Sequence, residues 1–92
     1  MSVVVRFAQP LTTEQYEQVK ARVSEGGGFP PDGLEYHVCF GPEGHRRVSE
    51  IWASREQFEA FGERLMPAIQ EAGMELEAEP EVLEVYSQVR GG

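Results

Sequence analysis

The 92-residue sequence has a single cysteine and few basic residues, and these scarcities exclude several classes of protein. Because Cys39 has no second cysteine to pair with, an intrachain disulfide and a site built from several cysteines are both excluded. The net charge is −8, and no basic cluster is longer than the pair Arg46 and Arg47. Such a surface repels a phosphate backbone, so we expect no nucleic acid among the partners.

Long apolar runs are absent as well. No segment approaches the roughly 18 consecutive apolar residues that a membrane-spanning helix requires. Residues 1–8 lack the basic region and long apolar stretch of a secretory signal. We therefore expect a cytoplasmic protein that has no membrane partner.

What the sequence does contain is enough apolar material for one small domain. Hydrophobic residues make up 40% of the chain, which suits a globular protein. We expect a single domain over residues 1–92, with 91–92 as a frayed tail. A chain of this size buries a modest share of its surface, so a second copy would add to its stability.

Hydrophobic periodicity and capping residues predict six elements in the order βαββαβ. Thr12 with Gln15 and Ser54 with Gln57 have the spacing of helix-capping boxes, and Gly73 ends the second helix. The predicted elements are strands at 2–8, 34–40, 45–53 and 82–89 and helices at 12–25 and 54–72. This order predicts an α+β, ferredoxin-like domain, with a four-stranded antiparallel sheet and both helices on one face.

Two features of this pattern carry further expectations. The second helix has an apolar stripe at helical spacing, which predicts a buried face. Pro67 removes a backbone hydrogen bond inside that helix, so we expect a bend or a local break there. Residues 74–79 alternate between apolar and acidic residues and fit either an edge strand or a loop.

The hairpin at 34–53 predicts which side chains the helices cover. A two-residue turn at 42–43 would place Glu35 opposite Glu50 and His37 opposite Val48. The side chains then expected beneath the helices are Leu34, Tyr36, Val38, Phe40 and Ile51. Those expected on the other, open face are Glu35, His37, Cys39, Val48, Glu50 and Trp52.

The outer strands extend this open face. Val3, Val5 and Phe7 suit the helix side, as do Leu83, Val85 and Val89, which leaves Val4, Arg6, Val82, Glu84, Tyr86 and Gln88 on the open face. A face that carries tryptophan and valine is not expected to stand in water. We therefore expect a homodimer in which two sheets pack through their open faces and enclose a cavity.

The passage from the hairpin to the last strand resembles a known family. The residues that carry the resemblance are Glu50, Trp52, Ser54, Phe58, Phe61, Pro67, Gly73 and the EPEV segment at 79–82. They resemble small dimeric α+β barrel proteins of the ferredoxin-like superfamily, most of all the antibiotic-biosynthesis-monooxygenase-like group and its uncharacterised actinobacterial relatives. The resemblance implies two subunits packed sheet to sheet, with a ligand cavity inside the barrel or between each sheet and its helices.

The sequence departs from that group at one position. The group's pattern has a histidine nine residues after the tryptophan, and this chain has Phe61 there. Members of the group include cofactor-free oxygenases of aromatic polyketides and haem-degrading enzymes, and His-dependent chemistry, haem ligation included, loses its usual residue here. His37 can substitute if it reaches the same cavity.

His37 is the candidate catalytic residue, because an imidazole can exchange protons near neutral pH. The alternative is a half-buried strand histidine, hydrogen-bonded to Glu35, Glu50 or Tyr86. Trp52 either stacks on a planar ligand or packs in the protein interior. The candidate ligand-binding residues are Trp52, Tyr86, Glu50, Glu35 and Arg6.

The two glutamates allow two interpretations. Opposed carboxylates can act as an acid and base pair when they are buried, whereas solvated ones are neutralised by a neighbour such as Arg6 or Arg46. Together with His37 they lack a diagnostic metal spacing, so we expect no metal, and we expect no cofactor.

Two functional hypotheses remain open. One is a homodimeric, monooxygenase-like barrel with an aromatic-lined cavity for a small planar organic molecule. The other is a non-catalytic module for small-ligand binding or dimerisation.

Overall fold

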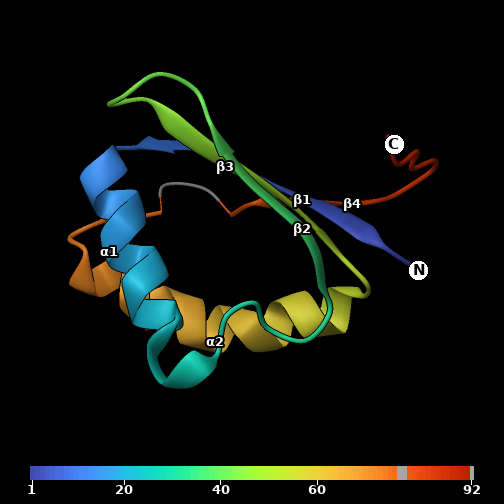
Figure 1. Ribbon diagram of the computed structural model, residues 1–92, viewed down its shortest axis with the longest axis horizontal. Coiled ribbons are helices and arrows are strands. Elements are labelled where there is room, and N and C mark those ends of the chain that lie inside the picture. Colours follow the sequence, from blue (N-terminus) through green and yellow to red (C-terminus); the bar gives the residue numbers. More distant parts are fainter. Residues whose placement is uncertain (77–78, 92) are drawn as a thin grey trace.

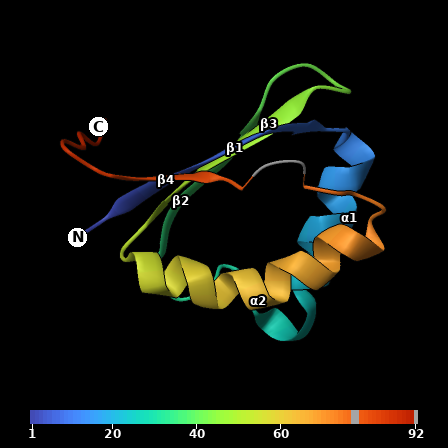
Figure 2. The same ribbon diagram turned by 180° about the vertical axis from the view of Figure 1, so that it is seen from behind.

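The computed structural model describes residues 1–76 and 79–91. Its elements are β1 (Val3–Leu11), α1 (Thr13–Val23), the 3₁₀ helix η1 (Glu25–Gly27), β2 (Leu34–Phe40), β3 (Arg46–Trp52), α2 (Arg55–Glu71) and β4 (Glu81–Glu84). The strands form an antiparallel sheet in the order β2-β3-β1-β4, and both helices lie on one side of it (Figures 1 and 2). The predicted ferredoxin-like fold is confirmed.

The helix starts follow the capping residues. Thr12 Oγ1 accepts a hydrogen bond from the Gln15 backbone N–H, and the Gln15 side chain accepts one from the Thr12 N–H. This reciprocal pair satisfies two backbone donors that a helix end leaves open, so the predicted capping box is confirmed. Ser54 caps α2 through the Gln57 N–H, at 3.2 Å. The second helix continues through Pro67 without a break.

Strand lengths differ from the prediction at both ends of the chain. The first strand continues beyond Ala8 to Leu11, with a bulge between Phe7 and Leu11. The last strand ends at Glu84, because its partner β1 begins at Val3, directly opposite. In the alternating stretch 74–79, residues 74–76 and 79 are not in a strand, and residues 77–78 lie outside the described part of the chain. The predicted tail residue 92 also lies outside it.

The core forms between α2 and the helix-facing side of the sheet. Its buried apolar residues are Val3, Val5, Val23, Trp52, Phe58, Phe61, Ala68 and Ile69. Trp52 is fully buried, and its ring centroid lies 5.8 Å from that of Phe58 and 5.4 Å from that of Phe61. The apolar stripe predicted for the second helix thus faces the core, and Trp52 is the largest side chain that it covers.

The predicted faces of β3 were wrong. Trp52 pairs with Val3 and Glu50 pairs with Val5, and directly opposed residues share a face of the sheet. Because both valines are buried beneath the helices, Trp52 and Glu50 lie on the helix side and not on the open face. Pairing with the central strand β1 therefore decides which face of β3 is covered.

The hairpin register also differs from the prediction. Residues 41–46 connect the last pair, Phe40 and Arg47, so the turn is longer than two residues. As a result His37 lies opposite Glu50, and the predicted pairing of Glu50 with Glu35 does not form. A bulge between Leu34 and Tyr36 brings Leu34 back to the helix side, opposite Trp52.

The open face is apolar in its own right. Tyr36 is 52% exposed and Phe40 is 43% exposed, although both were expected beneath the helices. In β4, Val82 pairs with Val5 and packs against the core, while Leu83 is 49% exposed, which reverses the prediction for this strand too. Both faces of the sheet carry apolar side chains, so hydrophobicity alone could not distinguish them.

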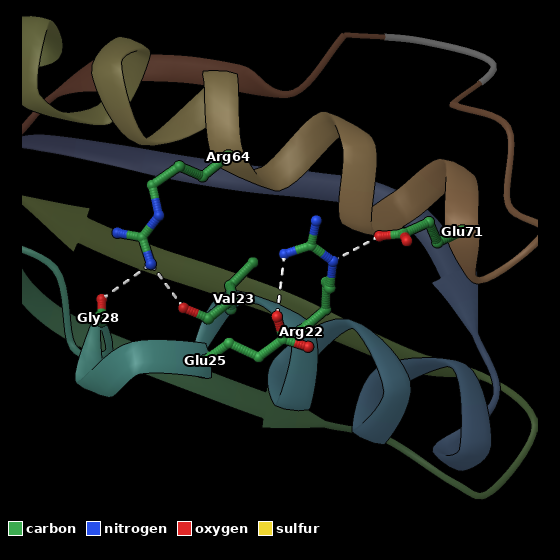
Figure 3. Close-up of polar contacts among 6 residues, drawn as sticks. All are labelled: Arg22, Val23, Glu25, Gly28, Arg64 and Glu71. Carbon is green, nitrogen blue, oxygen red and sulfur yellow. Dashed lines mark hydrogen bonds and ion pairs between the residues drawn. The ribbon is translucent and has the colours of Figure 1, made fainter.

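Two arginines tie α1 to α2 (Figure 3). Arg64 donates to the carbonyl oxygens of Val23, at 2.6 Å, and Gly28, at 3.3 Å. Arg22 forms ion pairs with Glu71 of α2 and with Glu25. A side chain at Gly28 would overlap the Arg64 guanidinium where it now lies, so Arg64 would have to move. The Arg64 contact with Gly28 fixes the start of the loop between η1 and β2.

Candidate functional site

Four side chains form a chain of hydrogen bonds on the helix side of the sheet. The Trp52 indole N–H donates to Glu50 Oε1 at 3.0 Å, and His37 Nδ1 lies 2.7 Å from Glu50 Oε2. The Tyr16 hydroxyl lies 2.8 Å from His37 Nε2. An ionised carboxylate can only accept, so Nδ1 carries the proton shared with Glu50. In the neutral imidazole, Nε2 then accepts the hydroxyl proton of Tyr16.

The chain of hydrogen bonds explains why a carboxylate lies in the core. Glu50 is 4% exposed, and an isolated carboxylate at such a position would cost several kcal/mol. Trp52 and His37 each supply one donor, so both carboxylate oxygens are satisfied. The alternation of β3 places Glu50 and Trp52 two residues apart on one face, and the hairpin register brings His37 beside them.

His37 is held in place by two aromatic rings from outside the sheet. Tyr16 comes from the second turn of α1, and its ring centroid is 5.9 Å from that of His37. Phe29, from the loop that Arg64 holds, approaches His37 edge-on, with centroids 5.8 Å apart and planes 87° apart. The imidazole therefore has a defined orientation as well as defined hydrogen-bond partners.

Burial raises the pKa of Tyr16, and the charges of Cys39, Glu17 and Glu50 raise it further. Both effects disfavour the tyrosinate, so the hydroxyl keeps its proton and acts as a donor to His37. Burial also raises the pKa of the Cys39 thiol, which lies in β2 two residues beyond His37. A raised thiol pKa lowers the thiolate fraction, so Cys39 is not an activated nucleophile.

A cavity of about 90 Å³ opens beside this chain, between the helices and the sheet. Its apolar wall includes Phe7, Val19, Phe29, Val48, Phe61 and Leu65, and its polar wall consists of Gln9, Tyr16, Lys20, His37 and Glu50. One water needs roughly 10–15 Å³ measured in this way, and an engineered apolar cavity of about 150 Å³ binds benzene. The space therefore holds several waters but is smaller than that benzene cavity, so a one-ring molecule would extend through its open mouth.

The structure brings three of the predicted site residues together. His37 and Glu50 line the cavity, and Trp52 packs behind them with its N–H on Glu50. The prediction that His37 is a half-buried strand histidine bonded to Glu50 agrees with this geometry. The cavity lies on the helix side, and not on the open face where these residues were expected.

The other three predicted residues lie elsewhere. Tyr86 is fully exposed in the segment after β4, which runs away from the helices (Figure 1). Glu35 is exposed and accepts a hydrogen bond from the Ser2 hydroxyl. Arg6 is exposed and lies 3.7 Å from Glu81. The interpretation of Glu35 and Glu50 as an acid and base pair does not apply, because the register places His37 opposite Glu50.

Sequence reasoning missed Tyr16, Lys20 and Phe29, which come from α1 and the loop after it. In the sequence, Tyr16 falls at helical spacing with the apolar residues Val19 and Val23. The overlooked signal was its hydroxyl, because a buried tyrosine normally finds a hydrogen-bond partner. A tyrosine on a core-facing stripe therefore predicts a polar group on the sheet beneath it.

The described residues, 1–76 and 79–91, show neither a metal-binding cluster nor a membrane-spanning helix. Within these ranges no group of three or more His, Cys, Asp or Glu side chains is arranged to hold a metal ion. No helix in the same ranges combines the length and apolar character needed to cross a bilayer. The cytoplasmic location stays a prediction.

Comparison with known proteins establishes the fold. No family model matches the chain, and no curated protein matches it in sequence. A solved structure with the same fold is a crystal structure provisionally described as an antibiotic biosynthesis monooxygenase from Chloroflexus aurantiacus J-10-fl. It is 19% identical, with a TM-score of 0.54, and the match covers 98% of this chain and 97% of that chain. The predicted resemblance is confirmed at the level of the fold.

Proposed function

We propose that this ferredoxin-like domain binds a small planar organic molecule between its helices and its sheet, and that His37 is the final acceptor of a proton from that molecule. The observation that carries the proposal is the chain Tyr16–His37–Glu50 at the wall of an apolar cavity. A carboxylate on one imidazole nitrogen makes the other nitrogen the basic one and stabilises the imidazolium that forms. The apolar wall makes water less favourable next to the reacting groups.

The position of Phe61 supports this assignment. In the group that the sequence resembles, a helix histidine occupies this position, and here Phe61 and His37 line the same cavity. That both residues line one cavity supports the assignment of the proton acceptor to His37. The imidazole of His37 on β2 can therefore act in the cavity that Phe61 on α2 also lines.

A monooxygenase-like reaction would follow from such a proton transfer. A methylene carbon that has lost a proton becomes electron-rich and can reduce dioxygen. The carbon then gains one oxygen atom as a carbonyl, the second oxygen atom leaves with both hydrogens as water, and no further reductant is needed. The Chloroflexus protein is provisionally described as a monooxygenase, which agrees with this class of reaction.

Deuterium exchange of acetophenone tests the proposal. We expect the protein to accelerate exchange of the methyl protons in D₂O, followed by proton NMR, and His37→Ala to lose about 10²-fold or more of that rate. His45→Ala is the matched control, since His45 is exposed in the turn between β2 and β3 and should leave the rate unchanged. Equal rates for folded His37→Ala and the parent protein would contradict the proposal. Binding without exchange would favour the non-catalytic module.

We further propose that the open face of the sheet pairs with a second copy of the chain. Tyr36, Phe40 and Leu83 expose apolar surface on this face. Arg47 pairs with Phe40 and therefore lies on the same face. Its buried Nε has no hydrogen-bond partner among the described residues. A second copy would cover the apolar side chains and offer acceptors to Arg47. The cavity lies on the helix side of the sheet, opposite to the proposed interface.

A further inference from the structure

Both nitrogens of His37 already have partners. Nδ1 is bonded to Glu50, and Nε2 lies 2.8 Å from the Tyr16 hydroxyl. A molecule in the cavity therefore cannot reach the basic nitrogen while Tyr16 is in place. Tyr16 and His37 both line the cavity, and the Tyr16 hydroxyl occupies the hydrogen-bonding position on Nε2.

We propose that Tyr16 is the catalytic residue that touches the ligand, and that it relays the ligand's proton to His37. This step rests on the proposed function of the cavity. The ligand gives its proton to Tyr16 Oη, while the hydroxyl proton of Tyr16 passes to His37 Nε2. The products are a ligand anion, a neutral tyrosine and an imidazolium. The Nδ1–H of this imidazolium stays hydrogen-bonded to the Glu50 carboxylate. Charge and protons balance without another reactant.

The surroundings of Tyr16 favour a coupled transfer of the two protons. Its raised pKa, caused first by burial and then by Cys39, Glu17 and Glu50, makes a lasting tyrosinate unfavourable. The Glu50 carboxylate lies 2.7 Å from His37 Nδ1 and can accept a charge-assisted hydrogen bond once the imidazole has received the proton. The positive charge therefore comes to rest on the imidazole.

The cavity wall also indicates the chemical class of the ligand. Lys20 lines the cavity, and its Nζ lies 5.8 Å from the centroid of the Tyr16 ring. The ammonium group can stabilise an anion that forms next to Tyr16. A neutral weak acid of about one ring, such as a phenol or an enolisable aryl ketone, meets these conditions. It enters an apolar cavity uncharged and becomes an anion beside Lys20.

Tyr16→Phe distinguishes the relay from direct contact with His37. If the ligand contacted His37 directly, removal of the Tyr16 hydroxyl would free Nε2. The rate of acetophenone exchange would then stay the same or rise. The relay instead predicts a loss of about 10²-fold, comparable to that of His37→Ala. It also predicts that the double variant is no slower than either single variant, because the two residues act as a unit. Tyr36→Phe, on the open face, is the matched control.

A second measurement does not depend on turnover. With 4-nitrophenol as the probe, at a pH where the free probe is mostly protonated, binding to the parent protein should raise phenolate absorbance in the visible range. Folded Tyr16→Phe should bind the probe without that rise. A rise equal to that of the parent would overturn the relay and leave the proposed function standing. Failure of the parent protein to bind the probe or to exchange acetophenone would overturn both.

Discussion

At the residue scale, Glu50 organises the candidate site. It lies opposite Val5 on one neighbouring strand and His37 on the other, and it accepts hydrogen bonds from Trp52 and His37. Removal of one partner from a buried charged pair typically costs about 3–5 kcal/mol, because the remaining charge is left without compensation. The orientation of His37 and the stability of the core therefore depend on the same carboxylate.

The raised pKa of Tyr16 makes a prediction about alkaline pH. Above the ordinary tyrosine pKa of 10.0, the unfolded chain loses this proton while the folded chain keeps it. The folded state then binds more protons, so this contribution to the free energy of unfolding is complete below about pH 10 and falls as pH rises through the folded pKa. Tyrosinate formation can be followed by absorbance in the parent protein and in Tyr16→Phe. The ionisation step that is present in the parent and missing in the variant should lie above pH 10. A removed step at or below pH 10 would contradict the assignment.

The sequence grouped His37, Glu50 and Trp52 correctly but could not supply their fourth member. Alternation within β2 and β3 is enough to place these three side chains on one face. Tyr16 reaches them through the packing of α1 on the sheet, which depends on the tertiary structure. The polar character of His37 and Glu50 favours the open face, yet their mutual hydrogen bond allows them to be buried.

At the element scale, the capping box of α1 offers a direct test. Thr12→Ala removes the acceptor for the Gln15 N–H, and we expect a loss of about 1 kcal/mol in the free energy of unfolding. For a domain of this size that loss lowers Tm by roughly 4–8 °C, measurable by circular dichroism. Thr12→Ser keeps the hydroxyl and should retain most of the stability. An unchanged Tm for Thr12→Ala would show that the cap contributes nothing.

Element types were predictable because they follow from local signals. Helix caps, the apolar stripe of α2 and the valine-rich β1 were all readable in the sequence. The hairpin register was not, because the open face carries Tyr36 and Phe40 and the covered face carries His37 and Glu50. A sheet with apolar residues on both faces gives no preference from alternation alone. The pairing of β3 with β1 resolves the choice.

At the scale of the whole molecule, the open face predicts the mass in solution. We expect light scattering to give twice the chain mass of 10.3 kDa for the parent protein. Tyr36→Arg places a charge from each copy in the proposed interface, so it should shift the mass to that of one chain. Met66→Arg is the control, because Met66 is 42% exposed on α2, away from the sheet. A parent protein with the mass of one chain would exclude the dimer.

The burial of Trp52 has a practical consequence for experiments on this protein. It is the sole tryptophan, so fluorescence excited at wavelengths where tyrosine does not absorb comes from one indole. That indole donates to Glu50, whose other oxygen is bonded to His37, and its ring lies 5.4 Å from Phe61 at the cavity wall. A proton arriving on the imidazole changes the electric field at the indole. The native chain thus contains its own optical reporter, and every variant named above retains it.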